Sequence, residues 1–330
     1  MRYAESKQVP VLLVLLAAAA IGCSKPAPSI EEEPASGASL PDAMAPAGSV
    51  LVCPTDLPGP KLVQVPAAGV GSFCMDARET TRGEYDAFVA AKAGDLGGQP
   101  AECFWNDSFT PFLFTVGPEN ELPEGVIAYC EHKSWEGVPA DWPVTCVDFC
   151  DALAYCEWAG KRLCGRVGGP AKWGRIYVAY EGYDEGKAFS PVAKSVEIEF
   201  VAACTQGGAT KYPYGDQYEP GRCIDSPWVK AHGKSLDALT DPPSGECHGT
   251  KPPYDAIHDL SGSVEEWQNL CDKTPGVSKI GAATVGSSAY YDYPSYVDNL
   301  SCTGGYGTGA AYETHAAVGF RCCADAVPAK

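Results

Sequence analysis

Sixteen cysteines in 330 residues constrain this chain more than any other feature of its sequence. Thiols at that density would be oxidation liabilities in a reducing cytosol, so the count indicates an oxidising compartment and a disulfide framework. The closely spaced Cys146, Cys150, Cys156 and Cys164 contain no C-x-x-C pair, which favours disulfides over a metal site there. With 36 glycines and 28 prolines, we expect a loop-rich fold.

The charge balance narrows the classes of partner. The formal net charge is −18, whereas binding to nucleic acid phosphates needs an excess of lysine and arginine. We therefore expect no nucleic-acid partner. A hydrophobic fraction of 45% excludes a wholly disordered chain and suffices for a core.

The N-terminus indicates export and lipidation. Residues 1–22 have a basic start and a short apolar stretch, which predicts a signal peptide rather than a membrane span. They end in Ala20-Ile21-Gly22-Cys23, which resembles a bacterial lipobox, so Cys23 is the expected lipidation site and the membrane a partner through that lipid. Ser24 after it favours the outer membrane, and we expect a lipid-anchored protein of the bacterial cell envelope.

The remaining chain divides by composition. Residues 23–49 contain the lipidated cysteine and a tether rich in proline and alanine, with few large apolar side chains to bury. Residues 50–326 form the expected folded domain, and 327–330 a tail. Residues 50–52 and 61–65 are expected strands, and Cys53 and Cys74 are expected partners across this hairpin-like start.

Two helices are predicted in the folded part. Thr81 and Glu84 have the spacing of a capping box, and the apolar residues that follow predict a helix ending near Gly94. A second helix is expected from about Asp148 to Ala159, because Gly160 suits the position after a helix end. From residue 165 onward, strong helix signals are scarce.

Four segments in order, and the C-terminal sequence, resemble one family, the formylglycine-generating enzymes, also called the sulfatase-modifying-factor domain. They include its "D-x-x-E" helix entry, its "D-A-x-A-Y-C-x-W-A-G-K-R-L" helix, its "Y-P-W-G" turn and its "D-M-x-G-N-V-W-E-W" strand. The segments here are FCMDARETTRGEYDAFV (73–89), PVTCVDFCDALAYCEWAGKRL (143–163), YPYG (212–215), DLSGSVEEW (259–267) and the closing GFRC (319–322).

This resemblance implies an irregular, loop-rich α+β fold of the C-type-lectin-like type, with two main helices and several disulfides. It also implies two disulfide pairings, Cys156 with Cys322 and Cys204 with Cys302. Both bridges would close long loops and would stabilise the fold by constraining the unfolded chain. Cys322 and Cys323 are adjacent, so their sulfurs need different partners.

The resemblance fails where the family's chemistry resides. Its enzymes oxidise a substrate cysteine with copper held by two cysteines in a "G-G-S-x-x-C-x-x-x-x-C" stretch. The matching residues here, 286–297, contain no cysteine, and phenol or carboxylate groups do not replace thiolates for Cu(I). We expect no catalytic residue, no copper and no cofactor, while Glu265 and Glu266 remain candidate oxygen ligands for calcium.

Aromatic residues crowd the same stretch. They could hold a peptide or a sugar ring in the region that lines the substrate groove of family enzymes, or they could serve core and loop packing. The groove candidates are Tyr290, Tyr291, Tyr293 and Tyr296.

Three functions stay open at this point. The chain is expected to be a non-catalytic domain that binds a peptide, glycan or envelope partner. It could instead be an oxidase-type enzyme of the same fold with another metal arrangement, or a purely structural lipoprotein. After lipidation 15 cysteines remain, so one is expected to lack an intramolecular partner. Of the five histidines, none forms an H-x-H or H-E-x-x-H pair, and His258 is expected to pack near residues 259–262.

Overall fold

A computed structural model describes most of the chain beyond the expected tether. All described residues belong to one compact unit, residues 45–330. None of the helices among them combines the length and the apolar composition needed to cross a bilayer. The described residues are 50–111, 130, 139–169, 178–180, 195–233, 246–272, 281–289 and 297–329.

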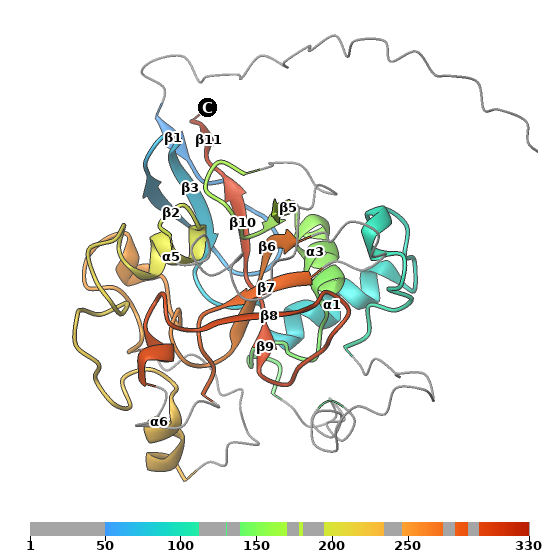
Figure 1. Ribbon diagram of the computed structural model, residues 1–330. Helices are drawn as coiled ribbons and strands as arrows, with labels where there is room; N and C mark the ends of the chain where they lie inside the picture. Colours follow the sequence, from blue (N-terminus) through green and yellow to red (C-terminus); the bar gives the residue numbers. More distant parts are fainter. Residues whose placement is uncertain are drawn as a thin grey trace, which may run out of the picture. The chain divides into compact units, whose positions relative to one another are not determined.

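A four-stranded antiparallel sheet joins the two ends of the folded part (Figure 1). The strand order is β2-β3-β10-β4, so the C-terminal strand β10 lies between β3 and β4. The strands are β2 (Leu62–Ala67), β3 (Gly71–Asp76), β10 (Cys322–Asp325) and β4 (Arg162–Leu163).

The first strand does not belong to the hairpin that its sequence position suggests. β1 (Leu51–Val52) pairs with β11 (Val327–Pro328), while β2 pairs with β3. Residues 327–328, which we expected in a tail, are therefore part of a two-stranded ribbon (Figure 1). A strand exposes its backbone groups to any nearby partner, and here the other end of the chain supplies it.

A second sheet carries the residues of the DLSGSVEEW segment. Its main path is β5-β6-β7-β8, and β9 pairs in parallel with the start of β6. The strands are β5 (Val178–Tyr180), β6 (Glu265–Asp272), β7 (Gly281–Val285), β8 (Tyr306–Ala310) and β9 (Val318–Gly319).

Both predicted helices are present. In α1 (Arg82–Lys92), the Thr81 side chain and the Glu84 side chain each accept from the other residue's backbone N–H, which completes the capping box. In α3 (Phe149–Trp158), Asp148 and Asp151 form the equivalent box. Eight of the ten α3 residues are buried, so this helix is central to the fold and not merely amphipathic.

Several short helices lie outside those two. Four of them fall in the region where helix signals were scarce. Of these, α6 begins with an Asp225 cap followed by Pro227 in its first turn. These short elements are η1 (Ala101–Cys103), α5 (Glu199–Cys204), α6 (Ser226–Ala231), η2 (Tyr254–Ala256) and η3 (Val297–Leu300).

The core consists of two large apolar clusters. One cluster surrounds α3 and contains Tyr85, Tyr155 and Phe320, whose rings contact one another. The other surrounds α5 and contains Phe73 and Phe200. Stacked and edge-to-face aromatic contacts of this kind add to the free energy gained by burying apolar surface.

Seven disulfides cross the described part. The structure forms the three bridges that we expected, Cys53–Cys74, Cys156–Cys322 and Cys204–Cys302. The adjacent Cys322 and Cys323 indeed take different partners. The four further bridges are Cys103–Cys150, Cys130–Cys146, Cys164–Cys323 and Cys223–Cys247.

Candidate functional site

The expected groove segment lies partly outside the described residues. Tyr290, Tyr291, Tyr293 and Tyr296 belong to the undescribed stretch, so their role in a groove stays a prediction. The described residues before them, 286–289, continue from β7 and include the buried Ser287, Ser288 and Ala289.

The segment before the expected groove packs on the turn that precedes β6. The Ala289 N–H donates to the Ser263 carbonyl at 3.1 Å, and the Gly262 N–H donates to the Ser287 hydroxyl at 3.4 Å. Gly286 has a φ of +78°, and a Cβ on it would lie 2.9 Å from the Phe200 ring, so only glycine fits there. The fold thus brings residues 259–263 and 286–289 together, as a shared site would require.

A buried arginine links this region to both ends of the domain. Arg321 is fully buried between β9 and β10, and its Nε donates to both Glu266 oxygens at 2.8 and 2.9 Å. Its Nη2 lies 3.7 Å from Glu79 and donates to the His258 carbonyl at 3.1 Å. Its Nη1 donates to the Asp76 carbonyl at 3.3 Å, so one guanidinium contacts residues 76–79, His258 and Glu266.

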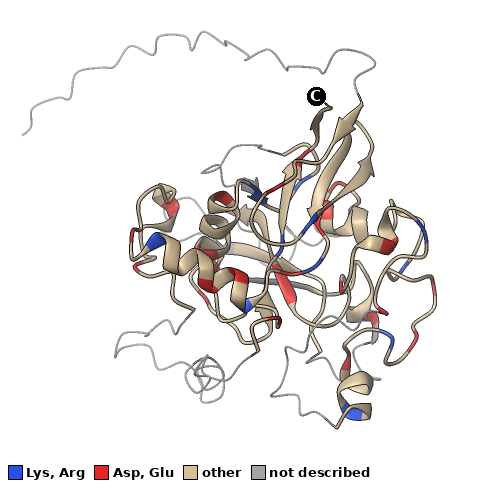
Figure 2. Cartoon of the chain, turned by 180° about the vertical axis from the view of Figure 1, so that it is seen from behind, with Lys and Arg blue, Asp and Glu red and all other residues tan. Residues whose placement is uncertain are grey.

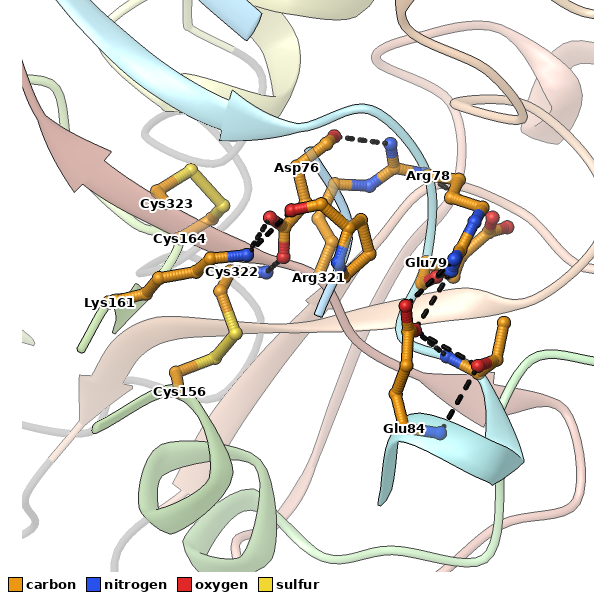
Figure 3. A network of polar contacts seen from close by, with 12 residues as sticks. Asp76, Arg78, Glu79, Glu84, Cys156, Lys161, Cys164, Arg321, Cys322 and Cys323 are labelled. Atoms are coloured by element: carbon orange, nitrogen blue, oxygen red, sulfur yellow. Dashed lines mark hydrogen bonds and ion pairs between the residues drawn. A yellow bond between two sulfur atoms is a disulfide. The ribbon is translucent and has the colours of Figure 1, made fainter. Parts of the chain in front are cut away.

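A second buried cation lies in the same network. Lys161 Nζ contacts Asp76 Oδ1 at 2.5 Å and donates to the Pro60 carbonyl at 2.8 Å, and both charged side chains are fully buried. The other Asp76 oxygen accepts from the Cys322 N–H at 3.0 Å. Figure 3 shows Lys161 and Asp76 beside two disulfides, one of which contains Cys322.

Burial changes the protonation of the carboxyl groups in this network. Loss of solvation raises the pKa of Asp76 to about 7, against the opposing attraction of Lys161. Burial also raises the pKa of Glu79 to about 8; Arg321 opposes this rise, and the nearby Asp259 and Glu266 charges add to it. Glu79 Oε1 is buried and has no hydrogen-bond partner among the described residues. Burial thus favours the protonated form of Glu79.

The calcium candidates differ in their surroundings. Both oxygens of Glu266 accept from Arg321. The guanidinium therefore occupies the position beside this buried carboxylate that a calcium ion would take. Glu265 is half-buried and accepts from the Thr284 hydroxyl at 2.8 Å. The structure thus gives Glu266 a structural role, and calcium binding at Glu265 stays a prediction.

Cysteine ligands are scarce in spite of the cysteine count. Among the described residues, one group of three potential metal ligands lies within reach of a single ion, namely Cys164, Glu199 and Cys323. Its two sulfurs form a disulfide, and Arg162 occupies the Glu199 carboxylate, so the group holds no metal-binding thiolate. Cys271 is the cysteine of the described part outside the seven bridges, and it is buried in the α3 cluster.

Two histidines that the sequence does not pair come together. His248 and His258 form an isolated antiparallel bridge, with ring centroids 5.3 Å apart. Sequence reasoning also missed the partners of Lys161 and Arg321. The sequence signal for these partners was a lysine or an arginine among residues that are otherwise buried. A buried charge needs an opposite charge beside it, so such a residue predicts a buried carboxylate partner.

The charged side chains outside this network are spread over the molecule. Lysine and arginine positions of the described part alternate with aspartate and glutamate positions instead of forming one basic face (Figure 2). The exposed ion pair Lys211–Asp298 shares no residue with the Arg321 network.

The comparison with protein families agrees with this architecture. The sulfatase-modifying factor enzyme 1-like domain matches residues 43–326. The chain belongs to this family. Its irregular, disulfide-rich α+β fold is the C-type-lectin-like fold of formylglycine-generating enzymes, which confirms the fold class expected from the sequence. No curated protein sequence matches this family member.

Solved structures with a similar fold include three proteins of low sequence identity. PvdO from Pseudomonas aeruginosa is 16% identical, with a TM-score of 0.44 over 80% of this chain and 90% of that chain. CarF is 16% identical, with a TM-score of 0.43 over 82% of this chain and 96% of that chain. Treponema denticola variable protein 1 is 13% identical, with a TM-score of 0.38 over 81% and 93%.

Proposed function

We propose that this chain is an envelope-anchored sulfatase-modifying-factor domain that binds a peptide or glycan of the cell envelope and does not oxidise cysteine. The proposed binding surface is the segment with Tyr290, Tyr291, Tyr293 and Tyr296, which follows in the sequence the residues 286–289 that pack on the turn at 259–263. Aromatic rings suit this task because they contribute large contact areas to peptides and sugar rings.

The distribution of the cysteines carries the proposal. Fourteen of the 16 form the seven disulfides, Cys271 is buried in the core, and Cys23 belongs to the lipobox. Residues 286–301 contain no cysteine, and Cys302 is bridged to Cys204. A copper centre of the family type needs two neighbouring thiolates in this stretch.

The anchor follows from the lipobox and the tether. Cys23 would carry the lipid, and residues 24–49 would separate the membrane from β1. The mass of the mature N-terminal peptide tests this part by itself: diacylglycerol on Cys23 is expected, and an unmodified Cys23 or an intact signal peptide would contradict the anchor.

The non-catalytic part is tested with copper. The full chain is incubated with Cu(I), O2 as the oxidant, excess thiol and a cysteine-containing peptide, and peptide aldehyde is measured by mass spectrometry. We expect no aldehyde, and thiol mapping is expected to find Cys271 as the thiol of the domain. Aldehyde formation, or two reactive thiols near residue 302, would support an oxidase instead.

Binding is tested on arrays of envelope glycans and peptides. The variants Tyr290→Ala and Tyr291→Ala are expected to weaken binding about fivefold each, since stacking on one aromatic ring contributes about 1 kcal/mol. Phe104→Ala is the matched control, because Phe104 is an exposed aromatic residue next to η1. Equal loss in the control would contradict a tyrosine-lined surface, and binding to neither array would favour a purely structural lipoprotein.

A further inference from the structure

His248 and His258 bring two imidazole rings together at a place for which the family resemblance gives no role. The two residues are bridge partners in antiparallel orientation. Their ring centroids are 5.3 Å apart, and the ring planes make an angle of 63°. Both residues are half-buried, so part of each remains exposed to solvent.

The backbone holds both histidines in place. The His258 N–H donates to the Ala77 carbonyl at 2.8 Å, and its own carbonyl accepts from Arg321. Beside His248, the Cys247 carbonyl accepts from the Asp259 N–H at 2.8 Å. Cys247 is also bridged to Cys223, so the two segments that carry the rings are fixed relative to each other. Rings held by packed backbone lose little freedom when they bind a ligand.

The hydrogen bonds leave a ring nitrogen of each histidine for a ligand. His248 Nδ1 lies 2.7 Å from the Gly249 carbonyl oxygen, which can only accept, so Nδ1 carries the proton and Nε2 keeps its lone pair. His258 Nδ1 is buried and has no hydrogen-bond partner among the described residues. A carbonyl that orients the other nitrogen of a ligating imidazole is a common feature of metal sites.

The centroid distance agrees with a shared metal ion. Metal–nitrogen bonds of about 2.0–2.1 Å at a tetrahedral angle place two imidazole centroids about 5 Å apart. We propose that His248 and His258 together bind one divalent transition-metal ion, with water in the remaining coordination positions. The ion class is that of Zn²⁺ and Cu²⁺, because imidazole nitrogen suits these ions and no thiolate is required.

The charges near the pair permit a cation. Arg321 donates to the His258 carbonyl, and its contact with both Glu266 oxygens offsets part of its positive charge. Metal binding uses the neutral form of each imidazole, so protons and the ion compete for the pair.

The test uses the full chain and Cu²⁺ as the probe, followed by Zn²⁺ in competition. We expect about one tight equivalent of Cu²⁺, with an electron paramagnetic resonance spectrum showing coupling to two imidazole nitrogens. His248→Ala and His258→Ala are each expected to lower the affinity by more than about tenfold. Loss of a residue that only orients a metal ligand already costs about tenfold, and each of these variants removes a ligand itself. Zn²⁺ is expected to displace the Cu²⁺ spectrum.

The matched controls are His232→Ala and His315→Ala, which remove exposed imidazoles outside the pair. We expect both to keep wild-type affinity. Unfolding curves of the apo variants show whether the substitutions preserve the fold, and the nitrogen count of the wild-type spectrum is independent of any variant. No binding by the wild type, a spectrum with fewer than two imidazole nitrogens, or equal binding by His248→Ala would overturn the proposal.

Discussion

Two lysine–aspartate pairs of this protein have similar geometry and opposite surroundings. Lys161 and Asp76 contact each other at 2.5 Å with both side chains 0% exposed. Lys211 and Asp298 contact each other at 2.9 Å with side chains 49% and 84% exposed. From the contact distance alone, the two pairs would be expected to contribute equally to stability, but water solvates only the second pair.

The difference shows what the buried charges do in this fold. An exposed pair is worth about 0–1 kcal/mol, because water competes for both charges. A buried pair costs desolvation to form, yet it strongly penalises any arrangement in which one partner is missing. Asp76 and Lys161 are 85 residues apart, and Arg321 bonds the Asp76 carbonyl across 245 residues. These contacts therefore favour one pairing of distant strands over others.

The strongest way to break this arrangement is Arg321→Met. It leaves Glu266 buried without its cation, and we expect the free energy of unfolding to fall by about 4–5 kcal/mol. Chemical denaturation of the disulfide-intact protein measures this. The double variant Arg321→Met with Glu266→Leu should recover part of the loss, and a loss in the double variant as large as in the single one would mean that the charge is not the cause.

Lys161→Met tests whether the buried Asp76 carboxyl becomes protonated when its cation is removed. Because burial raises the pKa of Asp76 to about 7, this group can take up a proton when its cation is removed. Without Lys161 the pKa of Asp76 rises further, so Asp76 stays protonated at pH 8 in the variant, whereas the wild type has the ionised pair. We expect a loss of about 2 kcal/mol at pH 6, growing by about 1.4 kcal/mol per pH unit above pH 7. Denaturation at both pH values checks the difference, and an equal loss at the two would show that Asp76 stays charged throughout.

Glu79→Gln tests the uncompensated carboxyl. The pKa of Glu79 is raised from 4.5 to about 8, so the stability it contributes is present below pH 4.5 and is lost as the pH rises through 8. Gln cannot ionise, and we expect the variant to gain about 4 kcal/mol relative to wild type between pH 5 and pH 9, at about 1.4 kcal/mol per pH unit up to pH 8. Asp76→Asn, unfolded under the same conditions, serves as the comparison. If the free energies of unfolding of wild type and Glu79→Gln changed equally with pH, the raised pKa of Glu79 would be refuted.

The smallest effect is expected for Lys211→Ala. Its ion pair with Asp298 is solvated, and we expect a change of less than about 0.5 kcal/mol at physiological salt. Thermal unfolding at low and high salt measures it. A loss comparable to that of Lys161→Met would remove the distinction between the exposed and the buried pair.

Local signals predicted the long helices well. The capping box of Thr81 and Glu84 and the Asp148 cap depend on residues three apart, so the sequence contains all the information. The short α6 was missed, although Asp225 and Pro227 mark its start. A six-residue helix has too few periodic positions for a hydrophobic pattern to stand out.

The candidate site was predictable only in part. The lack of cysteine in residues 286–301 and the bridges Cys156–Cys322 and Cys204–Cys302 followed from motif positions. The partners of Lys161 and Arg321 did not, because each ion pair joins segments that are far apart in sequence. The same holds for the four further disulfides, since spacing alone leaves many cysteine connectivities open.

The sequence by itself determined the family, the fold class and the absence of a thiolate pair where the copper chemistry would need it, because motifs and composition are local properties. Only the tertiary structure decided that β1 pairs with β11, that Glu266 faces Arg321, and that His248 meets His258. The physical reason is that a buried charge, an unpaired strand edge and a ring nitrogen can each interact with many chemically suitable groups. The three-dimensional fold determines which of these groups lies within contact distance.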